Sequence, residues 1–179
     1  MRQRSRYVGT GPGFPPEVVQ IARFRPADNE AVAELILHVQ QVEFGLPLGR
    51  DVQPDLWNIG GAFRGKGSRF WVAQAMDAVI GSVGLHDMGG GNGEVRRMFV
   101  AAAWRGGPHH VADQLLTTLL THAAARRTHT LWLGTSTHFL AAHRFYEKHD
   151  FRRVGAAAVP PGFIALPIEK HFYARPVQL

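Results

Sequence analysis

The chain has 179 residues, enough for one domain, and 45% of them are apolar, an ordinary share for a protein that buries a core. It contains no cysteine, which excludes a disulfide framework, a thiolate nucleophile and a cysteine-ligated metal. The formal charge of +6 favours anionic partners, namely phosphorylated cofactors, acidic substrates or nucleic acid. No apolar run approaches the roughly 20 residues of a membrane span. We therefore expect no membrane partner and place the protein in the cytoplasm, with which the lack of cysteine is compatible.

The N-terminal stretch 1–17 holds three arginines, three glycines and three prolines, which predicts a flexible arm. The remaining residues, 18–179, are expected to form a single domain. Its first elements are a strand over 18–25 and a helix that extends to about Phe44. The predicted cap of this helix is Asp28 or Asn29, and its predicted inner stripe is Ala31, Leu35, Val39 and Val42.

The middle of the chain is expected to hold a weaker helix and then two successive strands, over 54–63, 68–74 and 79–85. Gly81 and Gly84 remove side chains from the second of these strands, which indicates a bulge or close packing. The glycine-rich stretch 89–93 is followed by a strand and not by a helix. It is therefore predicted to be a hairpin loop rather than a phosphate-binding loop.

The stretch 94–151 is the most informative part of the sequence. It begins with an apolar strand over 94–100, followed by a turn rich in Gly, Pro and basic residues over 104–110. A helix follows, with apolar residues at helical spacing at 111, 115, 116, 119 and 120. A turn that delivers positive charge and free backbone N–H groups to a helix N-terminus predicts a phosphate site.

The second half of the chain alternates strands with helices. A buried strand, a helix with Ser136 or Thr137 as its cap, and two further strands are predicted, over 130–133, 138–149, from 151, and over 168–174. An irregular loop over 155–167 separates the last two strands. This alternation indicates a βαβ unit, and the hairpin-like first half then gives a mixed sheet with helices on its faces.

Three pieces of the chain carry a family resemblance: the strand 95–100 running into Arg105-Gly106, the helix with its paired leucines, and the stretch 142–151. The last piece, Ala-His-Arg-Phe-Tyr-Glu-Lys-His-Asp-Phe, is similar to an "A…FYEK.GF" signature. In this order the pieces resemble the GNAT superfamily of N-acetyltransferases, over roughly 19–155. The resemblance implies an α/β fold, with a mixed, mostly antiparallel twisted sheet of six to seven strands and helices on both faces. It also implies acetyl-CoA as the acetyl donor and direct attack by a primary amine.

The family's phosphate loop reads R/Q-x-x-G-x-G/A, and 107–112 occupies that frame here, with His110 in place of the first glycine. A side chain at this position hinders close approach of the backbone to a diphosphate unless a longer turn re-aims it. Phe139 stands where Asn is common, and Asp150 where Gly is common. The family pattern implies a strand bulge at 98–100 and a backbone N–H near Met98 or Phe99 that faces the thioester oxygen. The implied cofactor contacts are Met98, Phe99, Val100, Arg105, Gly106, Gly107, His109, His110, Val111, Ala112 and His143, and Arg144 is a further candidate.

Acetyl transfer needs a proton donor for the departing thiolate and a route for the proton of the amine. Tyr146 is the predicted general acid, because a phenol with a pKa near 10 is protonated at neutral pH. Glu94 is the predicted general base, acting through water. Its rivals are His38, Glu43, His86 and Asp87, and an amine that reacts already neutral needs no base.

The expected acceptor is a small-molecule amine, since no acidic groove for a basic peptide is evident. Two alternatives stay open: a catalytically silent module that senses acyl-CoA, and a basic acetyltransferase associated with RNA. Nucleic acid is the minority option, because no stretch combines dense Lys and Arg with interleaved aromatic residues. No metal is expected, because the helical histidines 138, 143 and 149 lie five and six residues apart. A homodimer is an expectation from the family alone.

Overall fold

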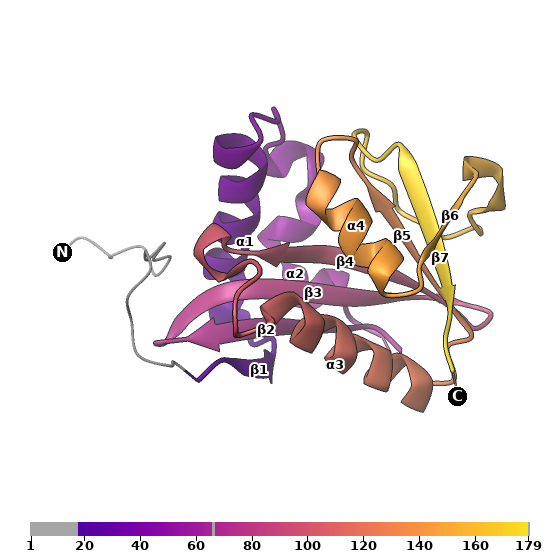
Figure 1. The fold of residues 1–179 in the computed structure, drawn as a ribbon, viewed down its shortest axis with the longest axis horizontal. Helices are drawn as coiled ribbons and strands as arrows, with labels where there is room; N and C mark the ends of the chain where they lie inside the picture. Colours follow the sequence, from indigo (N-terminus) through magenta and orange to yellow (C-terminus); the bar gives the residue numbers. More distant parts are fainter. Residues whose placement is uncertain (1–17, 66, 179) are drawn as a thin grey trace.

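Seven strands form one mixed sheet, in the spatial order β1-β2-β3-β4-β5-β7-β6 (Figure 1). This computed structural model describes residues 18–65 and 67–178, so the arm predicted over 1–17 lies outside the described residues. Only β4 and β5 pair in parallel, and every other neighbouring pair is antiparallel. The predicted mixed, mostly antiparallel sheet is thus confirmed. The strands are β1 Gln20–Arg23, β2 Arg69–Ala75, β3 Ala78–Gly89, β4 Asn92–Val100, β5 Thr130–Thr135, β6 Arg152–Val154 and β7 His171–Pro176.

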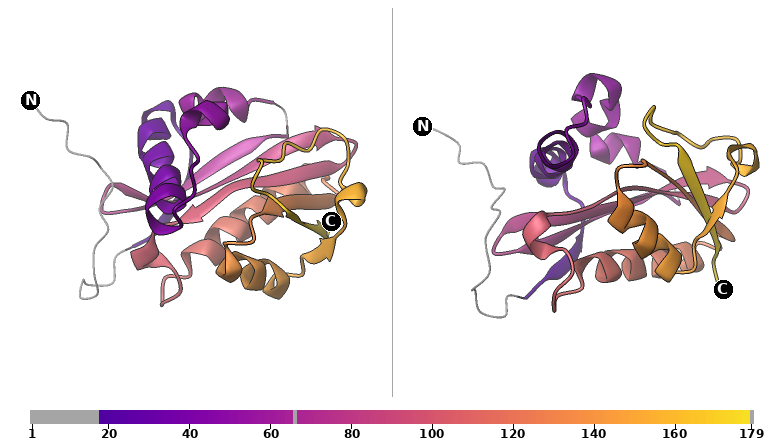
Figure 2. Two further views of the ribbon diagram at one scale, coloured as in Figure 1. Left: turned by 90° about the horizontal axis from the view of Figure 1, so that it is seen from above. Right: turned by 45° about the horizontal axis from the view of Figure 1, so that its top comes forward.

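Helices cover both faces of the sheet, as predicted (Figure 2). One face carries α1 (Asn29–Leu37) and α2 (Ile59–Ala62), and the other carries α3 (Val111–Ala125) and α4 (Leu140–Lys148). Shorter helical turns connect these elements, over Pro26–Asp28, Arg50–Val52, Pro54–Trp57, Ala102–Trp104 and Ala156–Ala158. Within 18–65 and 67–178, no helix has the length and apolar character needed to cross a bilayer.

The glycines of β3 allow close packing on the two faces of the sheet, as expected. A Cβ atom on Gly81 would lie 3.0 Å from Leu115 of α3, whereas one on Gly84 would overlap the ring of Phe63 on the opposite face. The stretch 89–93 is a tight hairpin between β3 and β4, with Gly90 and Gly91 in left-handed conformations that glycine adopts at little cost. The hairpin prediction is therefore confirmed.

The first helix has Asp28 at its N-cap position and ends next to Phe44, as predicted, but its capping hydrogen bond and its inner stripe differ. The Asp28 carboxylate accepts the backbone N–H of Arg25 at 2.8 Å, and Asn29 bonds the chain at Leu56 and Ile59, so neither side chain caps α1. The helix continues beyond Leu37 as a π-helical turn over His38–Glu43. Because a π-turn holds more residues per turn than an α-helix, it rotates later side chains away from the core. The buried apolar residues are therefore Val32, Ala33, Leu35, Ile36 and Val39, while Ala31 is half-buried and Val42 is 70% exposed.

Two elements of the second half begin later than predicted. The segment 136–139 forms a turn in which Ser136 Oγ accepts the N–H of His138, so α4 begins at Leu140. Likewise, Glu169 accepts the N–H of Leu166 through its side chain and closes a turn, so β7 begins at His171 rather than at 168. The loop before β7 consequently carries Glu169, which the strand prediction had placed within the sheet.

Candidate active site

The parallel strands β4 and β5 stay together over a short distance only. Their register comprises Asn92 with Thr130, Gly93 with Leu131 and Glu94 with Trp132. Beyond these pairs the strands diverge, and a cavity of about 620 Å³ lies between them. Its wall consists of β4 from Val95 onward, the end of β5, α4, the π-turn and the loop before β7. The two strands therefore separate beside the cavity.

A bulge in β4 adjoins this cavity. Ser82 pairs with Phe99 and Gly84 with Arg96, so Val83 alone faces both Arg97 and Met98. The bulge thus lies one residue earlier than the predicted 98–100. Its first residue, Arg97, has φ +54°, a left-handed conformation that is costly for any residue with a Cβ atom.

Hydrogen bonds on the β3 side determine which backbone groups of β4 face the cavity. Ser82 Oγ donates to the Arg97 carbonyl at 2.7 Å, and the N–H of Ala101 donates to the Ile80 carbonyl at 2.8 Å. A trans peptide points its C=O and N–H in opposite directions, so the N–H of Met98 points away from β3, toward the diverging edge. Of the two predicted oxyanion donors, Met98 is therefore the one that faces the cavity, whereas Phe99 pairs with Ser82 of β3.

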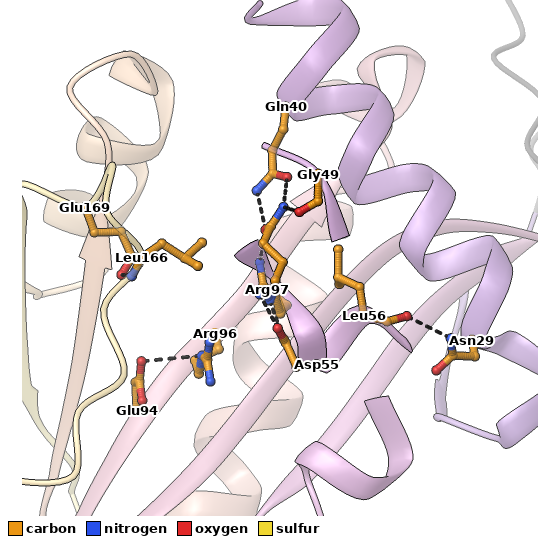
Figure 3. A network of polar contacts seen from close by, with 11 residues as sticks. Asn29, Gln40, Gly49, Asp55, Leu56, Glu94, Arg96, Arg97, Leu166 and Glu169 are labelled. Atoms are coloured by element: carbon orange, nitrogen blue, oxygen red, sulfur yellow. Dashed lines mark hydrogen bonds and ion pairs between the residues drawn. The ribbon is translucent and has the colours of Figure 1, made fainter. Parts of the chain in front are cut away.

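The side chain of Arg97 compensates for its strained backbone. Its Nε and Nη2 donate to the two carboxylate oxygens of Asp55, at 2.7 and 2.5 Å, and its Nη1 donates to Gln53 Oε1 at 2.5 Å. The amides of Gln53 and Gln40 bond each other reciprocally at 2.9 and 3.1 Å. This network joins the bulge to the π-turn and to the turn over Pro54–Trp57 (Figure 3). A buried arginine with a bidentate carboxylate partner thus holds the π-turn and the turn over Pro54–Trp57 against the bulge of β4.

The turn before α3 has the backbone of an anion site. Gly106 and Gly107 both have left-handed φ angles, +64° and +65°, and the first N–H groups of α3 have no partner within the helix. Gly106 and Ala112 line the cavity. His110 has φ +47°, where glycine is favoured, and its side chain is 69% exposed, with Nδ1 3.6 Å from Asp113. The long turn therefore carries the imidazole toward solvent at the N-terminus of α3.

Arg105 lines the cavity at the same turn, but its guanidinium is already engaged. Its Nη1 and Nη2 donate to the Glu43 carboxylate at 2.5 and 3.1 Å, and its Nε donates to the Val100 carbonyl at 2.8 Å. Its side chain is 37% exposed and its remaining Nη–H groups can still meet a phosphate, although the Glu43 carboxylate lies beside them. Glu43, one of the rival bases, is neutralised by the same pair.

Five predicted cofactor contacts lie outside the cavity wall: Gly107 and His110 of the turn, and three residues that pack elsewhere. His109 packs its ring against Trp104, with centroids 5.1 Å apart, and Val111 is a buried residue of the core. His143 uses both ring nitrogens within the protein: Nδ1 lies 2.8 Å from the Tyr173 hydroxyl and Nε2 lies 2.9 Å from the Ser136 carbonyl. His143 therefore links α4 to β7 through its ring nitrogens and is not part of the cavity wall.

The predicted acid and base occupy different places. Tyr146 lines the cavity from α4, and burial together with the nearby Glu169 raises the pKa of its hydroxyl. Glu94 is 2% exposed and lies behind the wall. Its carboxylate accepts the N–H of Ile164 at 3.3 Å and lies 3.4 Å from His86 Nδ1 and 3.5 Å from Arg96 Nε. Tyr146 can therefore reach a ligand directly, and Glu94 cannot do so without a bridging group.

Glu169 is the only carboxylate among the described residues that line the cavity, and the sequence prediction did not include it. Burial raises the pKa of its carboxyl to about 7, and the N–H of Leu166 opposes that rise. Glu94 raises the pKa further, whereas Arg96 and Arg97 lower it. A carboxyl that titrates near neutral pH is suited to accept a proton.

Comparisons with known proteins agree with this arrangement. A family model described as "Acetyltransferase (GNAT) domain" matches residues 66–153. A solved acetyltransferase of the GNAT family from Staphylococcus aureus Mu50 superposes with a TM-score of 0.86 and 27% identity, covering 90% of this chain and 100% of that one. In both sequence and fold, the chain is similar to GNAT acetyltransferases.

Other GNAT-related proteins differ in how much of their length matches. N-acetylaspartate synthetase of Danio rerio is 34% identical over 110 residues, which cover 60% of this chain but 38% of the relative. The chain therefore spans about two fifths of that protein. The structure of N-acetylglutamate synthase from Neisseria gonorrhoeae, complexed with coenzyme A and N-acetyl-glutamate, has a TM-score of 0.68 and 14% identity. It covers 90% of this chain and 36% of its own, and so shares the GNAT fold.

Proposed function

We propose that the protein is an acyl-CoA-dependent N-acetyltransferase that moves an acetyl group from acetyl-CoA to a small-molecule amine. The observation that supports this most is the cavity between the diverging ends of β4 and β5, which begins beside a glycine turn at a helix N-terminus. The cavity wall is basic, with Arg96, Arg97, Arg105 and Arg144, which suits a polyanionic donor.

The residues at the cavity fit acetyl-CoA, which supplies the acetyl group as an activated thioester. The backbone at Gly106, Gly107 and Ala112 would hold the diphosphate, with Arg105 beside it. The N–H of Met98 would donate to the thioester oxygen, where negative charge develops in the transition state. Tyr146 would donate its proton to the departing sulfur, because its raised pKa keeps the hydroxyl protonated throughout the neutral range.

The test is acetyl-CoA calorimetry on the full chain, followed by thiol release against a panel of small amines. Aspartate belongs in that panel because the Danio rerio relative is named N-acetylaspartate synthetase. We expect micromolar-range binding and turnover with part of the panel. Tyr146→Phe should lower kcat about 100-fold and leave acetyl-CoA affinity unchanged. Unaltered turnover in this variant would remove the acid role.

A catalytically silent acyl-CoA sensor is the second candidate. The feature that favours it is the turn before α3. His110 there has a left-handed φ that favours glycine, and the Arg105 guanidinium donates to the Glu43 carboxylate. Binding of acetyl-CoA without turnover of any amine would support the sensor. Absence of binding to any CoA thioester would refute both functions.

A further inference from the structure

Three arginines on or next to β4 line the cavity, and they differ in how their donors are used. Arg97 donates to the Asp55 carboxylate and to Gln53, and Arg105 donates to the Glu43 carboxylate and to Val100. The side chain of Arg96 is only 11% exposed, and its Nε lies 3.5 Å from Glu94 Oε1. Among residues 18–65 and 67–178, its guanidinium makes this ion pair and no hydrogen bond.

The Arg96 guanidinium therefore keeps its two Nη groups for a ligand. These Nη groups are not among the buried atoms that lack a partner, so they stay accessible in the cavity, where a ligand can replace water at them. A carboxylate satisfies such donors well, since its two oxygens match the fork of a guanidinium. Because Arg96 lies on β4 next to the bulge, a carboxylate bound there would place the rest of its molecule near the N–H of Met98.

Glu169 faces the same part of the cavity from the loop before β7. Its Oε2 accepts the N–H of Leu166 at 2.9 Å and packs against Gly134 of β5, where a Cβ atom would lie 2.8 Å from that oxygen. The charged and titratable groups around it are Glu94, Arg96 and Arg97 of β4, and Tyr146 of α4. The carboxyl therefore lies within electrostatic range of Arg96 and of the candidate acid Tyr146 (Figure 3 shows Glu169, Glu94 and Arg96).

We propose that the acceptor is an amino acid, whose carboxylate binds Arg96 and whose ammonium group gives a proton to Glu169. This rests on the proposed acetyltransferase function and specifies its substrate class. Glu169 takes the first proton of the ammonium group, and the neutral nitrogen then forms the C–N bond. As the C–S bond breaks, the sulfur takes the proton of Tyr146, and the second proton of the nitrogen restores that hydroxyl. The products are the N-acetyl amino acid, the free thiol of coenzyme A and one proton, released when Glu169 ionises again.

The wild-type protein tests the substrate class directly. Thiol release is compared for amino acids and for their decarboxylated counterparts: alanine against ethylamine, and aspartate against β-alanine and alanine. The kcat/KM for alanine should exceed that for ethylamine about 100-fold. Turnover of ethylamine with an equal kcat/KM would overturn the proposal while leaving the acetyltransferase function intact. Loss of acetyl-CoA binding and of all turnover would instead overturn both.

Two variants test the assigned residues. Arg96→Gln should raise the KM for the amino acid about 10- to 100-fold, with kcat largely retained, and Arg96→Lys should recover part of that loss. The amino acid should also raise the Tm of the wild-type complex with coenzyme A but not that of Arg96→Gln. Arg152→Gln, an exposed arginine on β6, is the matched control and should change neither. An unchanged KM in folded Arg96→Gln would overturn the carboxylate site.

Glu169→Gln should lower kcat/KM about 100-fold or more. In the wild type, kcat/KM should fall as the pH drops below about 7, where Glu169 becomes protonated, and the variant should lack this step. Glu30→Gln, at a surface pair with Arg50, is the control for removing one negative charge. A variant that keeps the same acidic limb would show that another group receives the proton.

Discussion

Replacing Arg97 tests the network that joins the bulge of β4 to the π-turn. The side chain of Arg97 is 3% exposed and that of Asp55 is 12% exposed, so Arg97→Ala leaves a largely desolvated carboxylate without its cation. Breaking a buried pair in this way costs about 3–5 kcal/mol. The free energy of unfolding from urea denaturation should fall by that amount, with an unchanged m-value.

Arg97→Gly separates the ion pair from the backbone strain. Both variants lose the same contacts with Asp55 and Gln53, but glycine adopts the left-handed φ of +54° without a Cβ penalty. Arg97→Gly should therefore be more stable than Arg97→Ala by about 1 kcal/mol, although glycine also has the more flexible unfolded state. Equal stability of the two variants would refute the strained bulge. A loss below about 1 kcal/mol in both would refute the energetic role of the buried pair.

Two further predictions concern the turn before α3 and the loop before β7. His110→Gly should bind acetyl-CoA about threefold more tightly by calorimetry, because bare backbone at a left-handed φ can approach a diphosphate more closely. Weaker binding would mean that the imidazole itself donates to phosphate. Because the folded-state pKa of Glu169 is raised from 4.5 to about 7, the folded protein binds more protons than the unfolded chain between those values, so stability falls as the pH rises through that window. At pH 8 this loss reaches at most about 3 kcal/mol, and Glu169→Gln should gain in Tm relative to wild type at pH 8 but not at pH 4. A Tm difference that is the same at both pH values would contradict the raised pKa.

Much of the fold follows from local patterns in the chain. The strand, glycine turn and helix over 94–125 are recognisable because apolar periodicity changes from strand to helix across a Gly- and Pro-rich turn. The family resemblance rests on the same stretch. Helix α1 was predicted less well, because nothing in local spacing announces that His38–Glu43 forms a π-turn.

The residues that complete the candidate site depend on contacts distant in sequence. Arg105 and Glu43 are 62 residues apart, and Arg97 and Asp55 are 42 apart. One local signal did exist: adjacent arginines in an apolar strand point to opposite faces, so Arg96 and Arg97 cannot share one solvated face. Glu169 carried no such signal, because an isolated glutamate near a predicted strand is commonly a surface group.

The parallel pairing of β4 with β5 is short, and this affects which acyl donors the proposed enzyme could use. If β4 and β5 move further apart beyond Glu94 and Trp132, no backbone hydrogen bond between the two strands breaks, because their pairing ends at these residues. In the proposed acetyltransferase, a donor with a chain longer than acetyl would therefore require side-chain contacts, and not β4–β5 hydrogen bonds, to change. The limit on chain length then comes from side chains that bridge the gap, above all Phe139 against Phe44 and Phe99.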